Sequence, residues 1–194
     1  MVTIGLLALQ GDYKAHQKML HDLGALTKLV RTVADLENLD GLILPGGEST
    51  TMGRLLDRYQ LRAPLTERLN NGLPAFGTCA GLILLARELE NTSTNFAQHG
   101  LGVLDARVAR NAYGTQVDSF ETTLKVPVLN ETIRAVFIRA PQIREVGEGV
   151  EILAHYEGVP VAVRQNQIMA AAFHPEIAGE SRLHKLWLDS IDKG

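Results

Sequence analysis

The only cysteine of the chain, Cys79, lies in the pentapeptide Gly77-Thr78-Cys79-Ala80-Gly81, between a strand-like and a helix-like apolar run. Small residues on both sides permit a tight strand-to-helix turn that exposes the middle side chain, as in the turns that carry many hydrolase nucleophiles. The free N–H groups and the dipole at a helix start favour a thiolate over a thiol. The alternative is a small buried hydrophobic residue, the commoner fate of a free cysteine. The pentapeptide predicts a nucleophile only if other residues complete a site.

A base and an acid that could orient it lie in the segment 173–176, Phe-His-Pro-Glu. A cysteine that attacks an amide needs a base, a group that orients the base, and donors for the developing oxyanion. Because Pro175 disfavours the helical region for His174, we expect an extended segment in which His174 and Glu176 point to one face. Glu176 then holds the ring of His174 while its other nitrogen faces Cys79. The alternatives are a core histidine at a strand end and an acid at a helix entry.

The loop 45–50, Pro-Gly-Gly-Glu-Ser-Thr, ends one predicted strand and opens a predicted helix. Glycines let backbone N–H groups face a ligand, and a helix N-terminus favours negative charge. We expect the N–H groups of Gly47 and Ala80 to be the two oxyanion donors. The loop lacks the Gly-Lys-Ser/Thr of a P-loop, so a nucleotide phosphate is not expected. A Ser or Thr helix cap after a glycine turn would account for the polar residues but not for both glycines.

The elements that must position these residues alternate between strand and helix in the first half of the chain. The hydrophobic pattern predicts strands at 2–9, 26–30, 42–44 and 74–77, and helices at 12–24, 34–39, 51–59, 64–70 and 82–89. This alternation indicates a parallel sheet with helices on both faces. Such sheets bind ligands at the carboxyl ends of their strands, where Gln10-Gly11, Gly46-Gly47 and Cys79 all fall.

The second half of the chain, from about residue 91, is richer in short β segments. They are predicted at 103–109, 120–128, 133–139, 152–156 and 159–164, and they indicate hairpins added at one edge of the sheet. A last core strand at 168–173 and a final helix capped by Ser181 follow. We therefore expect one α/β domain over residues 1–194, since a chain of this length can form a single core.

Composition excludes several classes of protein. A formal net charge of -3 gives no basic surface for nucleic acid or for a membrane, and no stretch approaches the ~20 apolar residues of a membrane helix. A single cysteine excludes an internal disulfide and fits a reducing compartment such as the cytoplasm. The other histidines show no metal-ligand spacing, so neither a metal nor a cofactor is expected; they are His16, His21, His99, His155 and His184.

Over almost its whole length the chain resembles the triad glutamine amidotransferases, and in particular the glutaminase subunits of pyridoxal 5'-phosphate synthase. The segments that carry the resemblance are 7–11 (LALQG), 41–51 (GLILPGGESTT), 77–81 (GTCAG), 110–114 (RNAYG), 116–120 (QVDSF), 137–141 (FIRAP) and 173–176 (FHPE). The cysteine turn and the His-Pro-Glu triplet are shared across the class. The PGGEST run and the segments between 110 and 120 are specific to the narrower family.

The resemblance implies a flavodoxin-like three-layer fold, with a mostly parallel sheet, helices on both faces and an added antiparallel β edge. It implies a triad of Cys79, His174 and Glu176. It also implies contacts with L-glutamine from six residues, which are Gly47, Glu48, Ser49, Arg110, Ile138 and Arg139. From the residues alone, the two arginines fit either a solvated strand edge or a substrate carboxylate.

The resemblance further implies that ammonia passes to a larger synthase subunit, whose docking activates the glutaminase. Gln10-Gly11, at a strand end near the glycine loop, is a reasonable place for that coupling. Two departures from the family, Thr115 in place of a common arginine and a slightly longer segment at 91–100, bear on the partner and not on the reaction. The alternatives are a glutaminase subunit for histidine or anthranilate synthesis, a redox-sensing or chaperone-like protein of the DJ-1 group, and a non-enzymatic assembly subunit.

Overall fold

The computed structural model describes residues 1–90, 99–110 and 119–191, and its main element is a seven-stranded sheet of order β10-β11-β12-β4-β3-β1-β2. These strands are β1 (Thr3–Leu7), β2 (Leu26–Val30), β3 (Gly41–Leu44), β4 (Ala75–Thr78), β10 (Glu151–Tyr156), β11 (Val159–Gln165) and β12 (Ile168–Ala171). From β2 to β12 neighbouring strands are parallel, whereas β11 pairs antiparallel with both β12 and β10. The predicted fold, a mostly parallel sheet with an antiparallel edge, is confirmed. Thr115 and residues 91–98 of the longer segment lie outside the described residues.

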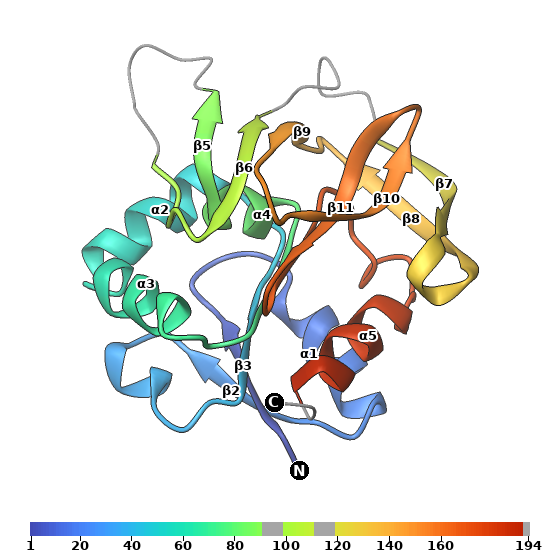
Figure 1. Cartoon of the computed structure of the whole chain (residues 1–194). Coiled ribbons are helices and arrows are strands. Elements are labelled where there is room, and N and C mark those ends of the chain that lie inside the picture. Colours follow the sequence, from blue (N-terminus) through green and yellow to red (C-terminus); the bar gives the residue numbers. More distant parts are fainter. Residues whose placement is uncertain (91–98, 111–118, 192–194) are drawn as a thin grey trace.

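Helices cover both faces of the sheet (Figure 1). They are α1 (Tyr13–Asp22) and α5 (Arg182–Ile191) on one face, and α2 (Ser49–Arg58), α3 (Arg62–Asn70) and α4 (Ala80–Leu85) on the other. On the first face, Trp187 of α5 packs on Gly41 of β3, where an added Cβ would come within 2.9 Å of the indole. On the second, a Cβ on Gly81 of α4 would lie 2.0 Å from the Leu44 carbonyl oxygen of β3. Glycine is thus required for α4 to approach the sheet this closely.

Two smaller sheets complete the fold. One contains β5 (Ala86–Glu90), β6 (Leu104–Ala109) and β9 (Gln142–Val146), and the other is the hairpin of β7 (Ser119–Val126) and β8 (Glu131–Ile138). Short 3-10 helices span Val33–Leu36 and Pro127–Leu129. Figure 1 shows both smaller sheets at the end of the molecule toward which β1 runs from the N-terminus.

The structure corrects two expectations about these segments. The helix predicted at 82–89 is wrong in its second half, because α4 ends at Leu85 and Ala86 begins β5, which pairs parallel with β6. Only the β10–β11 hairpin extends the main sheet, whereas the other predicted edge strands form sheets of their own, with β9 as an unpredicted member. The strand β5 forms because it pairs with β6, and local periodicity does not report pairing with a later part of the chain.

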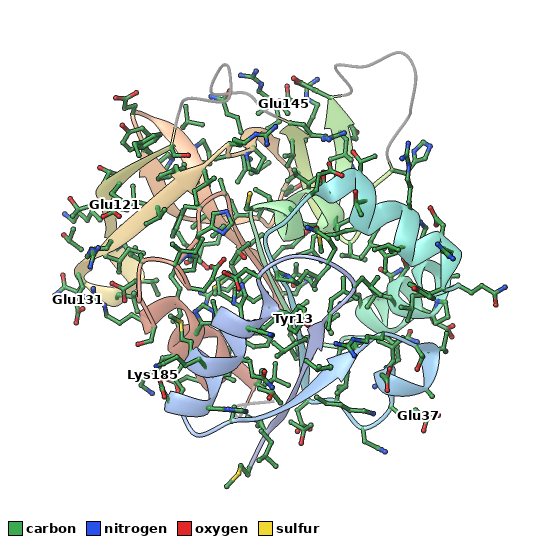
Figure 2. All side chains as sticks on the ribbon, turned by 180° about the vertical axis from the view of Figure 1, so that it is seen from behind. Tyr13, Glu37, Glu121, Glu131, Glu145 and Lys185 are labelled. Carbon is green, nitrogen blue, oxygen red and sulfur yellow. The ribbon has the colours of Figure 1, made fainter. Side chains whose placement is uncertain are left out.

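Charged side chains occupy the periphery. Figure 2 shows Glu37, Glu121, Glu131, Glu145 and Lys185 pointing outward. Several form exposed ion pairs, such as Arg134 with Glu121 at 3.2 Å and Lys185 with Asp189 at 3.0 Å. Within the described ranges, no helix is both long and apolar enough to cross a membrane.

Candidate functional site

Cys79 occupies a strained turn between β4 and α4. Its backbone has φ 48° and ψ -101°, a region that residues with a side chain rarely adopt, and it is the N-cap of α4. Its N–H donates to the Ala171 carbonyl of β12 at 2.8 Å, and its Sγ lies 3.9 Å from the Ile138 carbonyl oxygen. A Cβ on Gly77 would lie 2.7 Å from the Gly81 backbone, so the flanking glycines permit the turn. The tight turn expected from the pentapeptide is present.

His174 and Glu176 are in contact, through a turn and not through an extended segment. His174 Nδ1 lies 2.7 Å from Glu176 Oε1. The extended conformation predicted after His174 is wrong: Pro175 begins a turn, in which the His174 carbonyl accepts from Ala178 at 3.3 Å. β8 fixes the other side of the segment, since the His174 N–H donates to the Val136 carbonyl at 2.8 Å.

The electrostatics of the pair keep His174 protonated and Glu176 ionised. Burial by itself would lower the pKa of His174, but hydrogen bonds to Cys79 and Glu176, together with their charges, outweigh it and raise the pKa to about 10. Burial would raise the pKa of Glu176, but the charges and hydrogen bonds of His16 and His174 hold it far below its usual range. An ionised acid that holds a protonated imidazole beside a cysteine sulfur is the arrangement expected of a nucleophile, base and orienter.

The glycine loop packs against both His174 and the residues after β1. A Cβ on Gly46 would come within 2.3 Å of His174 Cε1, so only glycine leaves room for the ring. Gly11 has φ 101°, and a Cβ there would lie 2.0 Å from the Gly46 carbonyl oxygen. Gln10 Oε1 accepts from the Glu48 N–H at 2.8 Å. Gln10-Gly11 therefore packs against the loop that contains Gly47 and supports it.

Glu48, and not Ser49 or Thr50, caps α2. Its carboxylate accepts from the N–H groups of Thr50 at 3.1 Å and Thr51 at 2.7 Å. Burial would raise the pKa of Glu48, but a hydrogen bond from the Thr51 hydroxyl at 2.7 Å, together with these two N–H bonds, outweighs it and lowers the pKa below its usual value. The ionised carboxylate faces Arg110, whose Nη2 lies 3.6 Å from Glu48 Oε1. The cap thus also places an anionic group beside a cationic one at the mouth of the site.

These elements enclose a cleft of about 370 Å³. It is lined by Gly47, Glu48, Ser49, Cys79, Ile83, Arg110, Ile138, Arg139 and His174. Every residue expected to contact glutamine is therefore in its wall. Arg110 directly follows β6, and Arg139, with φ 46°, directly follows β8. The ends of these two strands thus place both arginines at the cleft. Ala80 is buried at the start of α4, and Gln10, Gly11 and Ala80 do not line the cleft.

Sequence reasoning missed three residues. Ile83 lines the cleft one helical turn after Cys79, a spacing that could have indicated it. His16 and His184 were dismissed for want of spacing, but His16 lies 3.5 Å from Glu176, and His184 lies 2.8 Å from His16 on the other side. They are 168 residues apart, so no local pattern links them. In the part of the chain that the structure describes, no group of three or more His, Cys, Asp or Glu side chains could hold a metal ion.

Comparisons with known proteins agree with this geometry. Residues 6–193 match the model of the SNO glutamine amidotransferase family. The chain is 51% identical to the pyridoxal 5'-phosphate synthase subunit PdxT of a Thermotoga species, over 98% of this chain and 100% of that protein. It is 50% identical to the protein of the same name from Mycobacteroides abscessus, over 98% of each. A crystal structure of a glutamine amidotransferase superposes with a TM-score of 0.90 at 47% identity, covering 97% of this chain and 98% of that one.

Proposed function

Because the chain belongs to the SNO glutamine amidotransferase family, we propose that it hydrolyses L-glutamine to L-glutamate and ammonia, and that the ammonia serves pyridoxal 5'-phosphate synthesis. The observation that carries the proposal is the shared cleft, in which Cys79 and His174 meet the glycine loop and two arginines. The relatives named PdxT favour this pathway over histidine or anthranilate synthesis.

In the first half of the reaction the Cys79 thiolate attacks the side-chain amide carbon of glutamine. The carbonyl oxygen becomes an oxyanion, which accepts hydrogen bonds from the N–H groups of Gly47 and Ala80. Ala80 is in the first turn of α4, where N–H groups have no partner within the helix. His174 donates its proton to the departing nitrogen, so that ammonia leaves and a γ-glutamyl thioester remains.

In the second half, water hydrolyses the thioester. His174, now neutral, takes a proton from the water as the hydroxyl attacks the thioester carbon. The carbon–sulfur bond breaks, glutamate leaves, and the thiolate and imidazolium are restored. Glu176 stays ionised throughout, since His174 and His16 both stabilise its charge. Its role is to hold the ring of His174 and to stabilise the imidazolium.

Recognition of glutamine follows from the charges at the mouth of the cleft. The α-carboxylate of the amino acid fits the guanidinium groups of Arg110 and Arg139, which line one side. The α-ammonium fits the ionised carboxylate of Glu48, which is 53% exposed and already faces a cation. Ile83 and Ile138 contact the methylene groups between the two ends.

A synthase subunit is the proposed recipient of the ammonia and the proposed activator. Gln10-Gly11 is a suitable coupling point, because its contacts with Gly46 and Glu48 transmit any displacement to the Gly47 donor. We place the protein in the cytoplasm, where a single thiol stays reduced.

The test measures ammonia released from glutamine by wild type and by Cys79→Ala, each with and without the synthase subunit. We expect Cys79→Ala to lower kcat at least about 10,000-fold, because the members of a catalytic triad act as a unit and removal of the nucleophile abolishes most of the effect of the others. We also expect the synthase to raise the wild-type rate. Asparagine, which is one methylene shorter, is the control substrate. Activity that survives in Cys79→Ala would refute the mechanism, and equal turnover with and without synthase would refute the coupling.

A further inference from the structure

Two fully buried histidines lie directly beneath the triad. His16 of α1 and His184 of α5 each have 0% exposure, and His16 Nδ1 lies 2.8 Å from His184 Nε2. On its other side, His16 Nε2 lies 3.1 Å from Thr78 Oγ1 and 3.5 Å from Glu176 Oε1. A continuous buried row thus joins α5 and α1 to the carboxylate that holds His174. The two helices are also adjacent on one face of the sheet (Figure 1).

In the described part of the chain, His184 touches one polar partner, the ring of His16. Its Nδ1 is buried with no protein partner there, and its Nε2 lies 2.8 Å from His16 Nδ1. Burial, reinforced by His16, lowers the pKa of His184 to about 3, so the ring stays neutral. The contact holds the ring of His16 with its Nε2 toward Thr78 and Glu176.

Glu176 depends on the contact with His16 because it has few other polar partners. Its side chain is 0% exposed, and within the described residues its Oε2 has no hydrogen-bond partner. Oε1 alone meets His174 Nδ1 at 2.7 Å and His16 Nε2 at 3.5 Å. A buried carboxylate is costly unless donors or cations face it. In the described part of the structure, His16 is thus the one basic side chain besides His174 within 4 Å of Glu176.

We propose that His16 is a positioning residue of the glutaminase triad, that His184 holds the ring of His16 in place, and that the pair keeps Glu176 ionised and aimed at His174. The proposal rests on the proposed function, in which Glu176 orients the base. His16 acts through Glu176 and His174 and does not touch the substrate, because it does not line the cleft.

The consequence is a defined change with pH. The groups that face Glu176 are His16 from α1, His184 behind it from α5, and His174 with Cys79 on the cleft side. Removing the His16 donor raises the pKa of Glu176, so the carboxylate becomes protonated at higher pH than in the wild type. A neutral Glu176 no longer stabilises the imidazolium. As the pH is lowered, a variant without His16 should therefore lose activity at a higher pH than the wild type does.

The experiment compares His16→Leu with His16→Gln, both with the synthase subunit present. Leucine fills the space without a donor, whereas glutamine places an amide N–H near the position of Nε2. We expect His16→Leu to lower kcat by about 10-fold to 100-fold, as loss of outer hydrogen-bond partners does at other sites, with KM changed less than about 3-fold. The acid limb of its kcat profile should lie at higher pH. His16→Gln should recover most of kcat and the wild-type acid limb.

A second readout does not need glutamine. Cys79 is the only cysteine, so its alkylation by iodoacetamide reports the thiolate and His174 pair directly. As the pH is lowered, the alkylation rate of His16→Leu should fall at a higher pH than that of the wild type. His184→Leu should show a smaller shift in the same direction. If His16→Leu does not fold, His184→Leu decides alone.

An unchanged acid limb in the folded His16→Leu protein, or a loss in His16→Gln as large as in His16→Leu, would overturn the proposal. Melting temperatures of all variants separate these effects from simple destabilisation. If the wild type releases no ammonia, the proposed function fails, while the alkylation profiles still decide whether His16 controls the pair.

Discussion

The two walls of the cleft are built differently. The inner wall, with Cys79 and His174, projects from the parallel sheet and is almost fully buried, at 7% and 6% exposure. The outer wall, with Glu48, Arg110 and Arg139, follows other strand ends and is open to solvent. The ion pair between Arg110 and Glu48 is long, at 3.6 Å, and the Glu48 side chain is 53% exposed. In the proposed mechanism, the groups of the inner wall make and break bonds and the groups of the outer wall recognise the substrate.

Burial explains the division. A thiolate, an imidazolium and a carboxylate interact strongly only where water is excluded, and they must already be aligned when the substrate arrives. Recognition of a free amino acid instead needs charged groups that reach solvent before binding. Changes in the inner wall should therefore reduce kcat, and changes in the outer wall should raise KM.

The largest expected effect comes from the inner wall. Glu176→Gln should lower kcat by about 1,000-fold to 10,000-fold with KM little changed, because the imidazolium loses its negative partner and its orientation. Steady-state kinetics of ammonia release measure this. Glu180→Gln is the matched control, since Glu180 is a buried carboxylate held by Arg182 outside the cleft. Equal losses of kcat in both variants would contradict a specific role for Glu176.

A smaller effect should follow from the support behind the glycine loop. Gly11→Ala should lower kcat by about 10-fold to 100-fold, because its Cβ would lie 2.0 Å from the Gly46 carbonyl and move the loop. Gly72→Ala is the control, with φ 94° and no heavy atom within 4 Å of its Cβ. Gly11→Ala should also lose more thermal stability than Gly72→Ala, as measured by calorimetry, because both share the strain of a positive φ but only Gly11 has the clash. A full rate in Gly11→Ala would show that the loop tolerates displacement.

The outer wall should respond in KM. Arg110→Gln should raise KM for glutamine by about 10-fold to 100-fold and leave kcat within a few-fold, since a charged hydrogen bond to the substrate is lost. Arg144→Gln, which removes an exposed partner of Glu90 at 3.4 Å, is the control and should change neither constant. A fall in kcat at constant KM would place Arg110 with the inner wall instead.

Titration of His174 tests the interactions within the inner wall without measuring turnover. NMR of labelled imidazoles should show a pKa of about 10 for His174 in wild type. In Cys79→Ala the pKa should fall, because the hydrogen bond and charge of Cys79 no longer favour the protonated ring. His184, with a pKa of about 3, should stay neutral from pH 5 to 9 in both proteins. An unchanged His174 would mean that Cys79 does not interact with it.

The smallest effect should come from the surface of the β7–β8 hairpin. Glu121→Gln removes the ion pair with Arg134, whose side chains are 66% and 63% exposed. The free energy of unfolding should change by less than about 1 kcal/mol, because solvent screens such pairs, and kcat should not change. Denaturant titration measures the first, and a loss above about 2 kcal/mol would contradict it.

Sequence reasoning predicted the site better than its surroundings. The pentapeptide around Cys79 and the His-Pro-Glu triplet are short segments whose residue types limit the backbone, so the turn at Cys79 and the contact between His174 and Glu176 were predictable. The backbone conformation that makes this contact was not predictable. Pro175 begins a turn, and the N–H groups of Ala178 and Glu180 stabilise this turn by hydrogen bonds.

Elements that depend on distant pairing were less predictable. The helix expected beyond Leu85 fails because Ala86–Glu90 pairs with β6. The hairpins were correctly predicted as β-rich, and β10–β11 joins the sheet edge as expected, whereas β6, β7 and β8 belong to separate small sheets. Whether a hairpin joins a sheet or forms its own depends on side chains far away in the sequence.

The sequence by itself determined a parallel α/β fold with a cysteine at one strand end, since burial on both faces and the small residues of the turn are local requirements. Only the tertiary structure decided what surrounds that cysteine. It brought Arg110 and Arg139 to the cleft from separate small sheets, and it joined His16 to His184 across 168 residues. The physical reason is that a buried charge interacts with the groups near it in space, whatever their separation in the sequence. The packing of α1 and α5 on the sheet sets those distances.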